Sequence, residues 1–429
     1  MKIKVQKSVV QGEISVPGSK SHTIRAILLA LMATGVSTIK NPLVSEDTIS
    51  CLYAALKLGA ELSEIYEDQV LIWKIKGTGG KLTNKTDEII DLGNSGTSLR
   101  LLAGMAATGS LKICFDGDHS LRGRPMGSLI SALEKLGVTV GTSEEGKCPL
   151  TVRGPITGSE TTVNGKSSQF VTSLLFATPL AEQDTKINIV NLNERPYIDV
   201  TLDWLDFMGI KYSFEEDYSS FTVKGKQKYK AYTRTMPADF STATFALGAA
   251  AITKGKLIIK NLDFNDKQGD KEIFDHLKRM GMRVRKNNNN VVVYRNVELN
   301  GDMEFDLNAT PDALPAMAAI ACYATGKTIL GNVIHARMKE TDRIVAMAEE
   351  LTKMGAKISE IQDGLVVHKS ELHGAVVNGH NDHRIIMALV IAALGATGET
   401  TIENARAVSV TYPDFVKDFQ KIHADIQKA

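Results

Sequence analysis

The segment SHTIRAILLALMATGVSTIKN (residues 21–41) predicts a helix that begins at a serine, ends at a glycine and leads into a short strand. Apolar side chains form a wide face along it, as expected of a helix that packs into a core; they are Ile24, Ile27, Leu28, Leu29 and Leu31. Three hydrogen-bond donors, Lys20, Ser21 and Arg25, crowd its N-terminus. The segment therefore combines a buried helix with polar groups gathered at one end.

Five further segments repeat this pattern of polar start, alanine-rich apolar helix, turn, strand and closing Asn or Asp. They are GTSLRLLAGMAATGSLKICFD (96–116), SSQFVTSLLFATPLAEQDTKINIVN (167–191), STATFALGAAAITKGKLIIKN (241–261), PDALPAMAAIACYATGKTILGN (311–332) and DHRIIMALVIAALGATGETTIEN (382–404). The closing residues recur at intervals of roughly 70 to 75 residues. Such a period indicates six copies of one structural unit.

A second motif, an amphipathic helix that ends just before a glycine and a strand, recurs with the same period. The glycines are suited to a left-handed C-terminal cap; they are Gly59, Gly137, Gly209, Gly281 and Gly355, with His423 at the sixth position. Together the two motifs predict an α/β fold of six βαβαββ units with buried helices, arranged as two domains of three units.

The sixth unit stops at ADIQKA (424–429) without its final strands, and the first residues of the chain resemble the missing segment. We therefore expect residues 1–18 to complete the last unit. The predicted domains are residues 19–232, and residues 1–18 together with 233–429. Two adjacent crossings between domains would make a hinge.

The composition is that of a folded protein: 429 residues, 43% hydrophobic and 23% charged. A formal net charge of +1 argues against nucleic acid or an anionic membrane as partner. The N-terminus lacks the apolar run of a signal peptide, and no stretch of 18 apolar residues occurs. Four scattered cysteines without metal-ligand spacing are predicted to be reduced core residues, so we expect a cytoplasmic protein.

Nearly every unusual polar cluster lies at the N-terminus of a predicted buried helix, where unpaired N–H groups and the helix dipole favour phosphates and carboxylates. Taken singly, Ser21, Thr97, Ser168 and Asp312 are explained as helix caps. Taken together, and beside Lys20 and Arg25, they predict an anion site.

Two charged loops lie outside these helices: LRGRPMG (121–127), which contains Arg124, and HARMKETDR (335–343). Alone, the second is typical of a solvated helix start. Beside an anion site it suggests catalysis, because Lys339 and Glu340 can exchange protons and Arg343 can bind a carboxylate or phosphate through two hydrogen bonds.

Other chemistries are not supported by the motifs. GKSS (165–168) and GKT (326–328) lack the glycine of a P-loop, since Glu160 and Ala321 stand in its place. HNDH (380–383) offers possible metal ligands but has no companion cluster. We therefore expect neither a metal nor a cofactor.

The chain resembles the 5-enolpyruvylshikimate-3-phosphate synthase (3-phosphoshikimate 1-carboxyvinyltransferase) family over essentially its whole length. The motifs that carry the resemblance are PGSKSHTIRA (17–26), LGNSGTSLR (92–100), GRPMG (123–127), SSQF (167–170), PDALP (311–315), KETDR (339–343) and NDHRI (381–385). The resemblance implies the two-domain enolpyruvyl transferase fold, an inside-out α/β barrel that closes around phosphoenolpyruvate and shikimate 3-phosphate. It also implies a monomeric transferase of the shikimate pathway, which supplies chorismate for aromatic amino acid biosynthesis, and inhibition by glyphosate.

By the same resemblance, the chain's residues divide between the two substrates. Those implied to hold shikimate 3-phosphate are Lys20, Ser21, Arg25, Ser167, Ser168, Gln169, Tyr197, Asp312 and Lys339. Those implied to hold phosphoenolpyruvate are Lys20, Asn94, Gly96, Arg124, Gln169, Arg343 and Arg384. The candidate catalytic residues are Asp312, for removal of the hydroxyl proton, and Glu340 and Lys20 as its proton-handling partners.

Four positions depart from the family pattern. Glu194 replaces a serine that contacts phosphate, so either Arg195 substitutes for it or Glu194 points away. His335 replaces an asparagine, Val410 replaces a lysine that contacts phosphoenolpyruvate, and Leu101 lies beside the glyphosate loop. Three alternatives remain: a UDP-N-acetylglucosamine enolpyruvyl transferase, a relative acting on another alcohol, and a non-catalytic phosphate-binding module.

Overall fold

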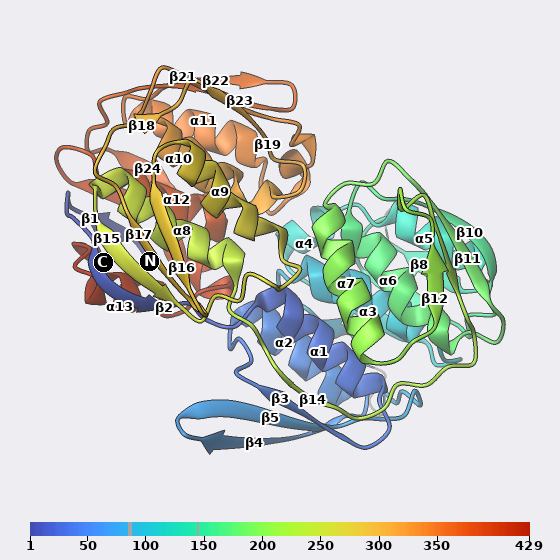
Figure 1. The fold of residues 1–429 in the computed structure, drawn as a ribbon. Helices are drawn as coiled ribbons and strands as arrows, with labels where there is room; N and C mark the ends of the chain where they lie inside the picture. The colour runs from blue at the N-terminus through green and yellow to red at the C-terminus, as the bar shows by residue number, and fades with distance from the viewer. Residues whose placement is uncertain (85–87, 144–145) are drawn as a thin grey trace. The chain divides into compact units, whose positions relative to one another are not determined.

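The computed structural model describes residues 1–84, 88–143 and 146–429, and it divides the chain into two compact units (Figure 1). Unit 1 comprises Met1–Pro17 with Ala238–Ala429, and unit 2 comprises Gly18–Pro237. Each unit has a hydrophobic core of its own, and no residue belongs to both cores.

Within the described residues, unit 2 contains three four-stranded sheets of one design, in which the first two strands are parallel and the others antiparallel. In spatial order the first sheet is β14 (Thr233–Thr235), β3 (Val36–Lys40), β5 (Val70–Lys76) and β4 (Glu61–Glu67). The second is β6 (Ile90–Asp91), β7 (Ile113–Asp116), β9 (Leu150–Arg153) and β8 (Thr139–Thr142). The third is β10 (Ser159–Asn164), β11 (Thr185–Val190), β13 (Ser220–Val223) and β12 (Tyr212–Phe214).

Unit 1 repeats the same design in its described residues. Its sheets are β2 (Gln11–Ser15), β15 (Lys256–Lys260), β17 (Asn290–Tyr294) and β16 (Arg283–Asn287); β19 (Met303–Asp306), β21 (Lys327–Gly331), β23 (Gly364–His368) and β22 (Lys357–Ile361); and β24 (Val376–Asn378), β25 (Thr400–Glu403), β1 (Ile3–Val5) and β26 (Ile426–Lys428). A short pair, β18 (Leu299–Asn300) with β20 (Ala324–Thr325), is added. The predicted two-domain α/β fold is thereby confirmed.

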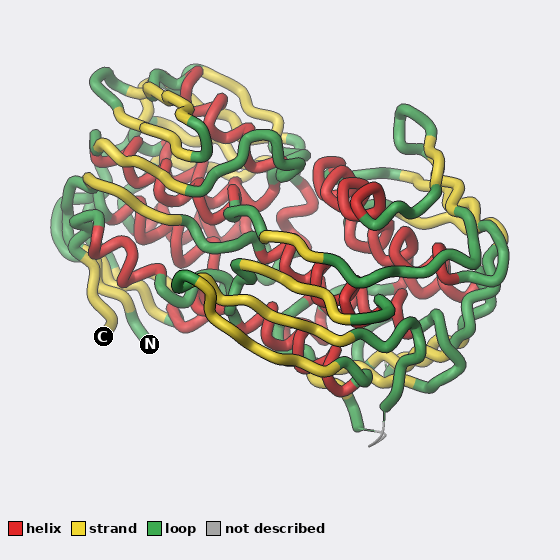
Figure 2. The backbone as a smooth tube through the Cα atoms, turned by 60° about the horizontal axis from the view of Figure 1, so that its bottom comes forward, coloured by secondary structure: helices red, strands yellow, loops and turns green. Residues whose placement is uncertain are grey.

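Each sheet accompanies one buried helix, and the helices lie inward of the strands (Figure 2). The buried helices are α1 (Lys20–Met32), α3 (Gly96–Ala106), α6 (Ser168–Ala177), α8 (Phe240–Thr253), α10 (Leu314–Ala321) and α12 (His383–Ala393). All 14 residues of α8 are buried, because its sequence is apolar on every side. In unit 2, α3 packs against α1 and α6, and in unit 1 the helices α8, α10 and α12 pack against one another.

A second, more amphipathic helix completes each copy. These are α2 (Glu46–Lys57), α5 (Gly127–Lys135), α7 (Arg195–Phe207), α9 (Glu272–Arg279), α11 (Arg343–Lys353) and α13 (Phe415–Lys421), with the short α4 (His119–Gly123) before α5. The five predicted cap glycines all have positive φ, and His423 takes the same conformation at 66°. Five closing asparagines are left-handed as well; they are Asn41, Asn191, Asn261, Asn332 and Asn404. The repeat is thus one of backbone conformation as well as of hydrophobic pattern.

The strands next to the two crossings are exchanged between the units. β2 precedes α1 in the chain but pairs with β15 of unit 1, whereas β14 precedes α8 but pairs with β3 of unit 2. β1 takes the place of the last strand of the sixth copy. The chain passes from one compact unit to the other after Pro17 and after Pro237, so β14 belongs to unit 2.

None of the described helices has the length and apolar character that a bilayer span requires.

Candidate active site

In unit 2 the N-terminal turns of the buried helices are linked by hydrogen bonds. Arg100 of α3 donates from Nη1 to Gln169 Oε1 of α6 at 2.6 Å, and Gln169 Nε2 donates to Thr97 Oγ1 of α3 at 2.9 Å. The guanidinium of Arg25 on α1 reaches Thr172 Oγ1 of α6 at 3.5 Å. The polar helix ends that the sequence singled out in this unit therefore meet.

Arg25 is a buried cation held by neutral oxygens. It is 2% exposed and donates to Thr201 Oγ1 from Nε at 3.2 Å and from Nη2 at 3.1 Å. It also donates to the carbonyls of Ser21 at 3.0 Å and Tyr197 at 3.1 Å. Burial lowers the pKa of Arg25 to about 10. Such a charge gains strongly from a nearby anion, because its desolvation has not been offset by a carboxylate.

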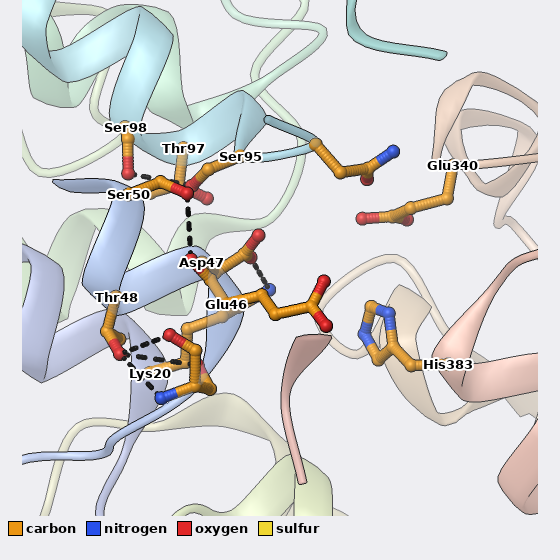
Figure 3. A network of polar contacts seen from close by, with 12 residues as sticks. Lys20, Glu46, Asp47, Thr48, Ser50, Ser95, Thr97, Ser98, Glu340 and His383 are labelled. Carbon is orange, nitrogen blue, oxygen red and sulfur yellow. Dashed lines mark hydrogen bonds and ion pairs between the residues drawn. The ribbon is translucent and has the colours of Figure 1, made fainter. Parts of the chain in front are cut away.

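Lys20, the first residue of α1, forms an ion pair with Asp47 of α2, with Nζ 3.1 Å from Oδ2 (Figure 3). The side chains are 13% and 6% exposed. The sequence did not indicate Asp47, because an acidic residue in the first turn of a helix is ordinary.

The loop before α3 is tied to Arg124. Arg124 donates from Nη2 to Asn94 Oδ1 at 2.7 Å, and Asn94 donates from Nδ2 to Asp118 Oδ2 at 2.8 Å. Gly96 lies against the same guanidinium, since a Cβ there would be 2.6 Å from Arg124 Nη1. Asn94, Gly96 and Arg124, three residues assigned to phosphoenolpyruvate, are thereby brought together.

The N-terminus of α6 is occupied by a carboxylate of the chain itself. Oε2 of Glu194 accepts hydrogen bonds from Ser168 Oγ at 2.8 Å and from Ser168 N at 3.3 Å. The guanidinium of Arg195 instead lies 3.8 Å from the centre of the Tyr218 ring and donates to the Glu216 carbonyl at 3.1 Å. Glu194 is thus directed toward Ser168 and Arg195 toward Tyr218, and a carboxylate is a favourable partner for a helix N-terminus.

In unit 1 the charged residues gather around Arg343, the first residue of α11, which is 1% exposed. Its guanidinium contacts Asp312 Oδ1 at 2.7 Å, Glu340 Oε2 at 2.7 Å and Asp382 Oδ2 at 2.8 Å. Burial alone would lower the pKa of Arg343, but these carboxylates raise it well above its usual value. The two candidate acid–base residues Asp312 and Glu340 thus share one cation.

Arg384, in the first turn of α12, joins this cluster through Asp312 Oδ2 at 3.4 Å. Burial opposes its charge, and neighbouring carboxylates, Asp312 first, raise its pKa. Lys339 lies in the loop directly before Glu340, between the short helix η4 (Ile334–Met338) and α11. Asp382 was considered only as a metal ligand from the sequence; the structure makes it an arginine partner and the N-cap of α12.

Asp270 is a further acid of unit 1 that the sequence did not indicate. It is 2% exposed and accepts a hydrogen bond from Ser241, at the start of α8. Burial, followed by the charge of Asp312, raises the pKa of Asp270 to about 7.

Among the described ranges, Glu349, Glu350 and His380 form a group with metal-ligand spacing. Glu350 already accepts from Lys353 Nζ at 2.8 Å and from the Asn378 amide at 2.8 Å, and it lies 2.8 Å from His380 Nε2. The structure therefore gives this group a role in holding the loop before α12. The four cysteines are free, and Cys51, Cys148 and Cys322 are buried.

Two units of three βαβαββ copies, with cations at the helix ends of one and an arginine–carboxylate cluster in the other, define a protein built to bind anionic small molecules and to move protons. A family model described as EPSP synthase (3-phosphoshikimate 1-carboxyvinyltransferase) matches residues 5–419, and the chain belongs to this family.

Curated relatives of the same name span the chain. The 3-phosphoshikimate 1-carboxyvinyltransferase of Ruminiclostridium cellulolyticum is 45% identical over 428 residues, covering 100% of both chains. That of Acetivibrio thermocellus is 44% identical and covers 99% of both. Among solved structures, EPSP synthase from Acinetobacter baumannii matches with a TM-score of 0.81 and 25% identity over 100% of both chains.

Proposed function

We propose that this protein transfers the enolpyruvyl group of phosphoenolpyruvate to the 5-hydroxyl of shikimate 3-phosphate and releases phosphate, a step of the shikimate pathway toward aromatic amino acids. One geometrical observation carries the assignment of the chemistry: Arg343 bonds both Asp312 and Glu340, so two carboxylates suited to proton transfer lie on one buried cation. The name of the relatives, 3-phosphoshikimate 1-carboxyvinyltransferase, supports the choice of substrates.

The binding roles follow the charges. The residues proposed to hold shikimate 3-phosphate are Lys20, Ser21, Arg25, Ser167, Ser168, Gln169, Tyr197, Asp312 and Lys339. Those proposed to hold phosphoenolpyruvate are Lys20, Asn94, Gly96, Arg124, Gln169, Arg343 and Arg384. The buried charge of Arg25, held by neutral oxygens, supports its role toward an anionic substrate.

The reaction proceeds by addition and elimination. The oxygen of the 5-hydroxyl bonds to C2 of phosphoenolpyruvate, its proton is taken by Asp312, and C3 receives a proton. The tetrahedral intermediate then loses phosphate from C2 and a proton from C3, which restores the carbon–carbon double bond. Glu340 and Lys20 give and recover the C3 proton, and the arginines offset the charge that develops on the carboxylate and phosphate oxygens.

Asp312 is oriented for this step by Arg343 on one oxygen and by Arg384 on the other, at 2.7 and 3.4 Å. A general base needs a fixed direction toward the proton it removes, so these contacts favour Asp312 over an exposed carboxylate.

Four finer points belong to the same proposal. The protein acts as a cytoplasmic monomer, glyphosate inhibits it at the phosphoenolpyruvate residues, units 1 and 2 are separate domains, and the paired crossings after Pro17 and Pro237 act as a hinge. The two crossing segments are hydrogen-bonded to each other within each unit, by Ser19 N to Pro237 O at 2.7 Å in unit 2 and by Asp239 N to Pro17 O at 3.0 Å in unit 1.

The experiment is phosphate release from phosphoenolpyruvate with shikimate 3-phosphate or with UDP-N-acetylglucosamine as acceptor, for the wild type, Asp312→Ala and the control Asp302→Ala. Asp302 lies in unit 1, where its amide donates to Asn300 Oδ1 at 3.2 Å and its Oδ1 accepts from Lys327 N at 2.9 Å. Release with shikimate 3-phosphate that is lost in Asp312→Ala alone is expected. Release only with UDP-N-acetylglucosamine, or equal rates in all three proteins, contradicts the assignment.

A further inference from the structure

The N-terminus of α6 presents an unusual arrangement: the end of a buried helix assigned above to a substrate phosphate already carries an anion. Ser168, the first residue of α6, is 1% exposed and gives both its amide and its hydroxyl to one oxygen of Glu194. Glu194 is itself only 3% exposed. The carboxylate is therefore built into the site and is not a surface charge that happens to lie nearby.

The backbone holds Glu194 in this position. Its φ of 57° is left-handed, an uncommon conformation for a residue with a side chain, and its carbonyl accepts from Tyr197 N at 3.0 Å in the first turn of α7. Pro196 follows within that first turn and restricts it further. The side chain is thus directed toward α6 by the entry into α7.

The groups of α6 that bond this carboxylate are the hydroxyl and the amide of Ser168. Arg195, the next residue, lies over the Tyr218 ring, and Arg25 is bonded to Thr201 of α7. A hydroxyl, a backbone amide and a helix dipole are also the groups that bind phosphate at a helix N-terminus. A phosphate and Glu194 cannot both use Ser168, because each needs the same two donors and the two charges repel.

We propose that Glu194 is a built-in competitor for the phosphate of the acceptor and sets how strongly the enzyme prefers phosphorylated over unphosphorylated acceptors. This rests on the proposed function, which places that phosphate at Ser167 and Ser168. In the empty protein Glu194 caps α6, and an acceptor phosphate binds only when the carboxylate leaves. The apparent dissociation constant is then the intrinsic constant divided by the fraction of molecules in which Ser168 has been released.

Two variants test the competition. Glu194→Gln keeps the shape of the side chain and removes its charge. Glu194→Ser removes the charge and also shortens the side chain, so that it no longer extends to Ser168. Glu215→Gln is the matched control, because it removes one exposed carboxylate from the same unit. Calorimetric binding of shikimate 3-phosphate should be tighter by about 10-fold or more in Glu194→Ser, less in Glu194→Gln, and unchanged in the control.

Steady-state kinetics measure acceptor preference, which would not change if Glu194 had only a structural role. The ratio of kcat/KM for shikimate 3-phosphate to that for shikimate should rise in both Glu194 variants, while KM for phosphoenolpyruvate stays as in the wild type. Thermal unfolding of all four proteins shows whether the loss of the α6 cap reduces stability. If Glu194→Ser does not fold, Glu194→Gln tests the inference. Its amide oxygen still accepts a hydrogen bond from Ser168, so the cap of α6 is kept while the charge is removed.

The failure of this inference is distinct from that of the proposed function. Normal turnover of shikimate 3-phosphate by the wild type, with equal affinity and equal acceptor preference in the Glu194 variants, overturns the inference and leaves the function standing. If no protein binds shikimate 3-phosphate, the proposed acceptor is wrong. Inorganic phosphate as probe then decides the inference: tighter binding in Glu194→Ser supports it, and equal dissociation constants overturn it.

Discussion

Gly96→Ala tests whether the first turn of α3 positions Arg124. An added Cβ would lie 2.6 Å from Arg124 Nη1, and ordinary contact begins at 3.4 Å, so the guanidinium must retreat by about 0.8 Å. That shift disturbs the 2.7 Å hydrogen bond from Arg124 to Asn94 and moves the cation away from phosphoenolpyruvate. A hydrogen bond to a charged group contributes about 1.5–3 kcal/mol, so KM for phosphoenolpyruvate should rise about 10- to 100-fold.

Steady-state phosphate release with phosphoenolpyruvate varied measures this change, and the matched control is Gly127→Ala. Gly127 begins α5 in the same unit, and among the described residues outside its own helix and chain neighbours no heavy atom lies within 4 Å of a Cβ added there. Gly96 is the first residue of a helix and has no positive φ, so alanine fits its backbone and the unfolding temperature should not fall. A KM for phosphoenolpyruvate that is the same in Gly96→Ala and Gly127→Ala would refute the role given to this contact.

Arg343→Gln should lower the free energy of unfolding by about 3–5 kcal/mol in chemical denaturation, because it leaves its carboxylate partners buried without their cation; an unchanged midpoint would contradict this. Burial raises the pKa of Asp270 to about 7 in the folded protein, from an ordinary value of 3.8. At a pH between these two pKa values, the folded state keeps a proton on Asp270 that the unfolded chain has lost. The free energy of unfolding should therefore fall as the pH rises from about 4 to 7. Asp270→Asn should flatten that part of the curve, and parallel curves for the two proteins would exclude the effect. Arg25→Met should raise KM for shikimate 3-phosphate more than KM for phosphoenolpyruvate, as measured by varying each substrate in turn. A fragment of residues 18–237 should unfold cooperatively, whereas one ending at residue 232 should be less stable because it lacks β14.

The repeats were predictable because each copy carries its own local signals. An apolar helix, a left-handed Asn after the following strand and a left-handed Gly after the outer helix can all be recognised without knowledge of distant residues. His423 shows the strength of this pattern, since it takes the glycine conformation at 66° in the copy where glycine is missing.

The exchanged strands could not be predicted in the same way. β14 lies before α8, and local order alone would assign it to the helix that follows. β2 was predicted to join the C-terminal domain only because the last unit of the chain is incomplete. Their pairing with β15 and β3 depends on contacts between segments more than 190 residues apart, for which the sequence carries no local signal. The compact unit that contains β14 ends at Pro237, whereas the sequence predicted a domain limit at residue 232.

In the candidate site, too, local features could be predicted from the sequence and distant partners could not. The polar helix ends could be recognised as possible anion sites because the residue types and positions are local properties. The partners that decide their electrostatics are distant: Asp47 for Lys20, Glu194 for Ser168, and Asp382 for Arg343. In the sequence each of these acids is compatible with an ordinary cap or a solvated charge, and only the fold shows which cation or helix end it meets.

The charges of the two units imply different tasks. In unit 2, the buried Arg25 donates to hydroxyl and carbonyl oxygens. In unit 1, the buried Arg343 contacts three carboxylates, those of Asp312, Glu340 and Asp382. An added anion therefore gains more from Arg25, whose partners are neutral, than from Arg343, whose charge is already offset. We therefore expect Arg25 to bind a substrate anion, and we expect Arg343, besides its proposed contact with phosphoenolpyruvate, to orient Asp312 and Glu340.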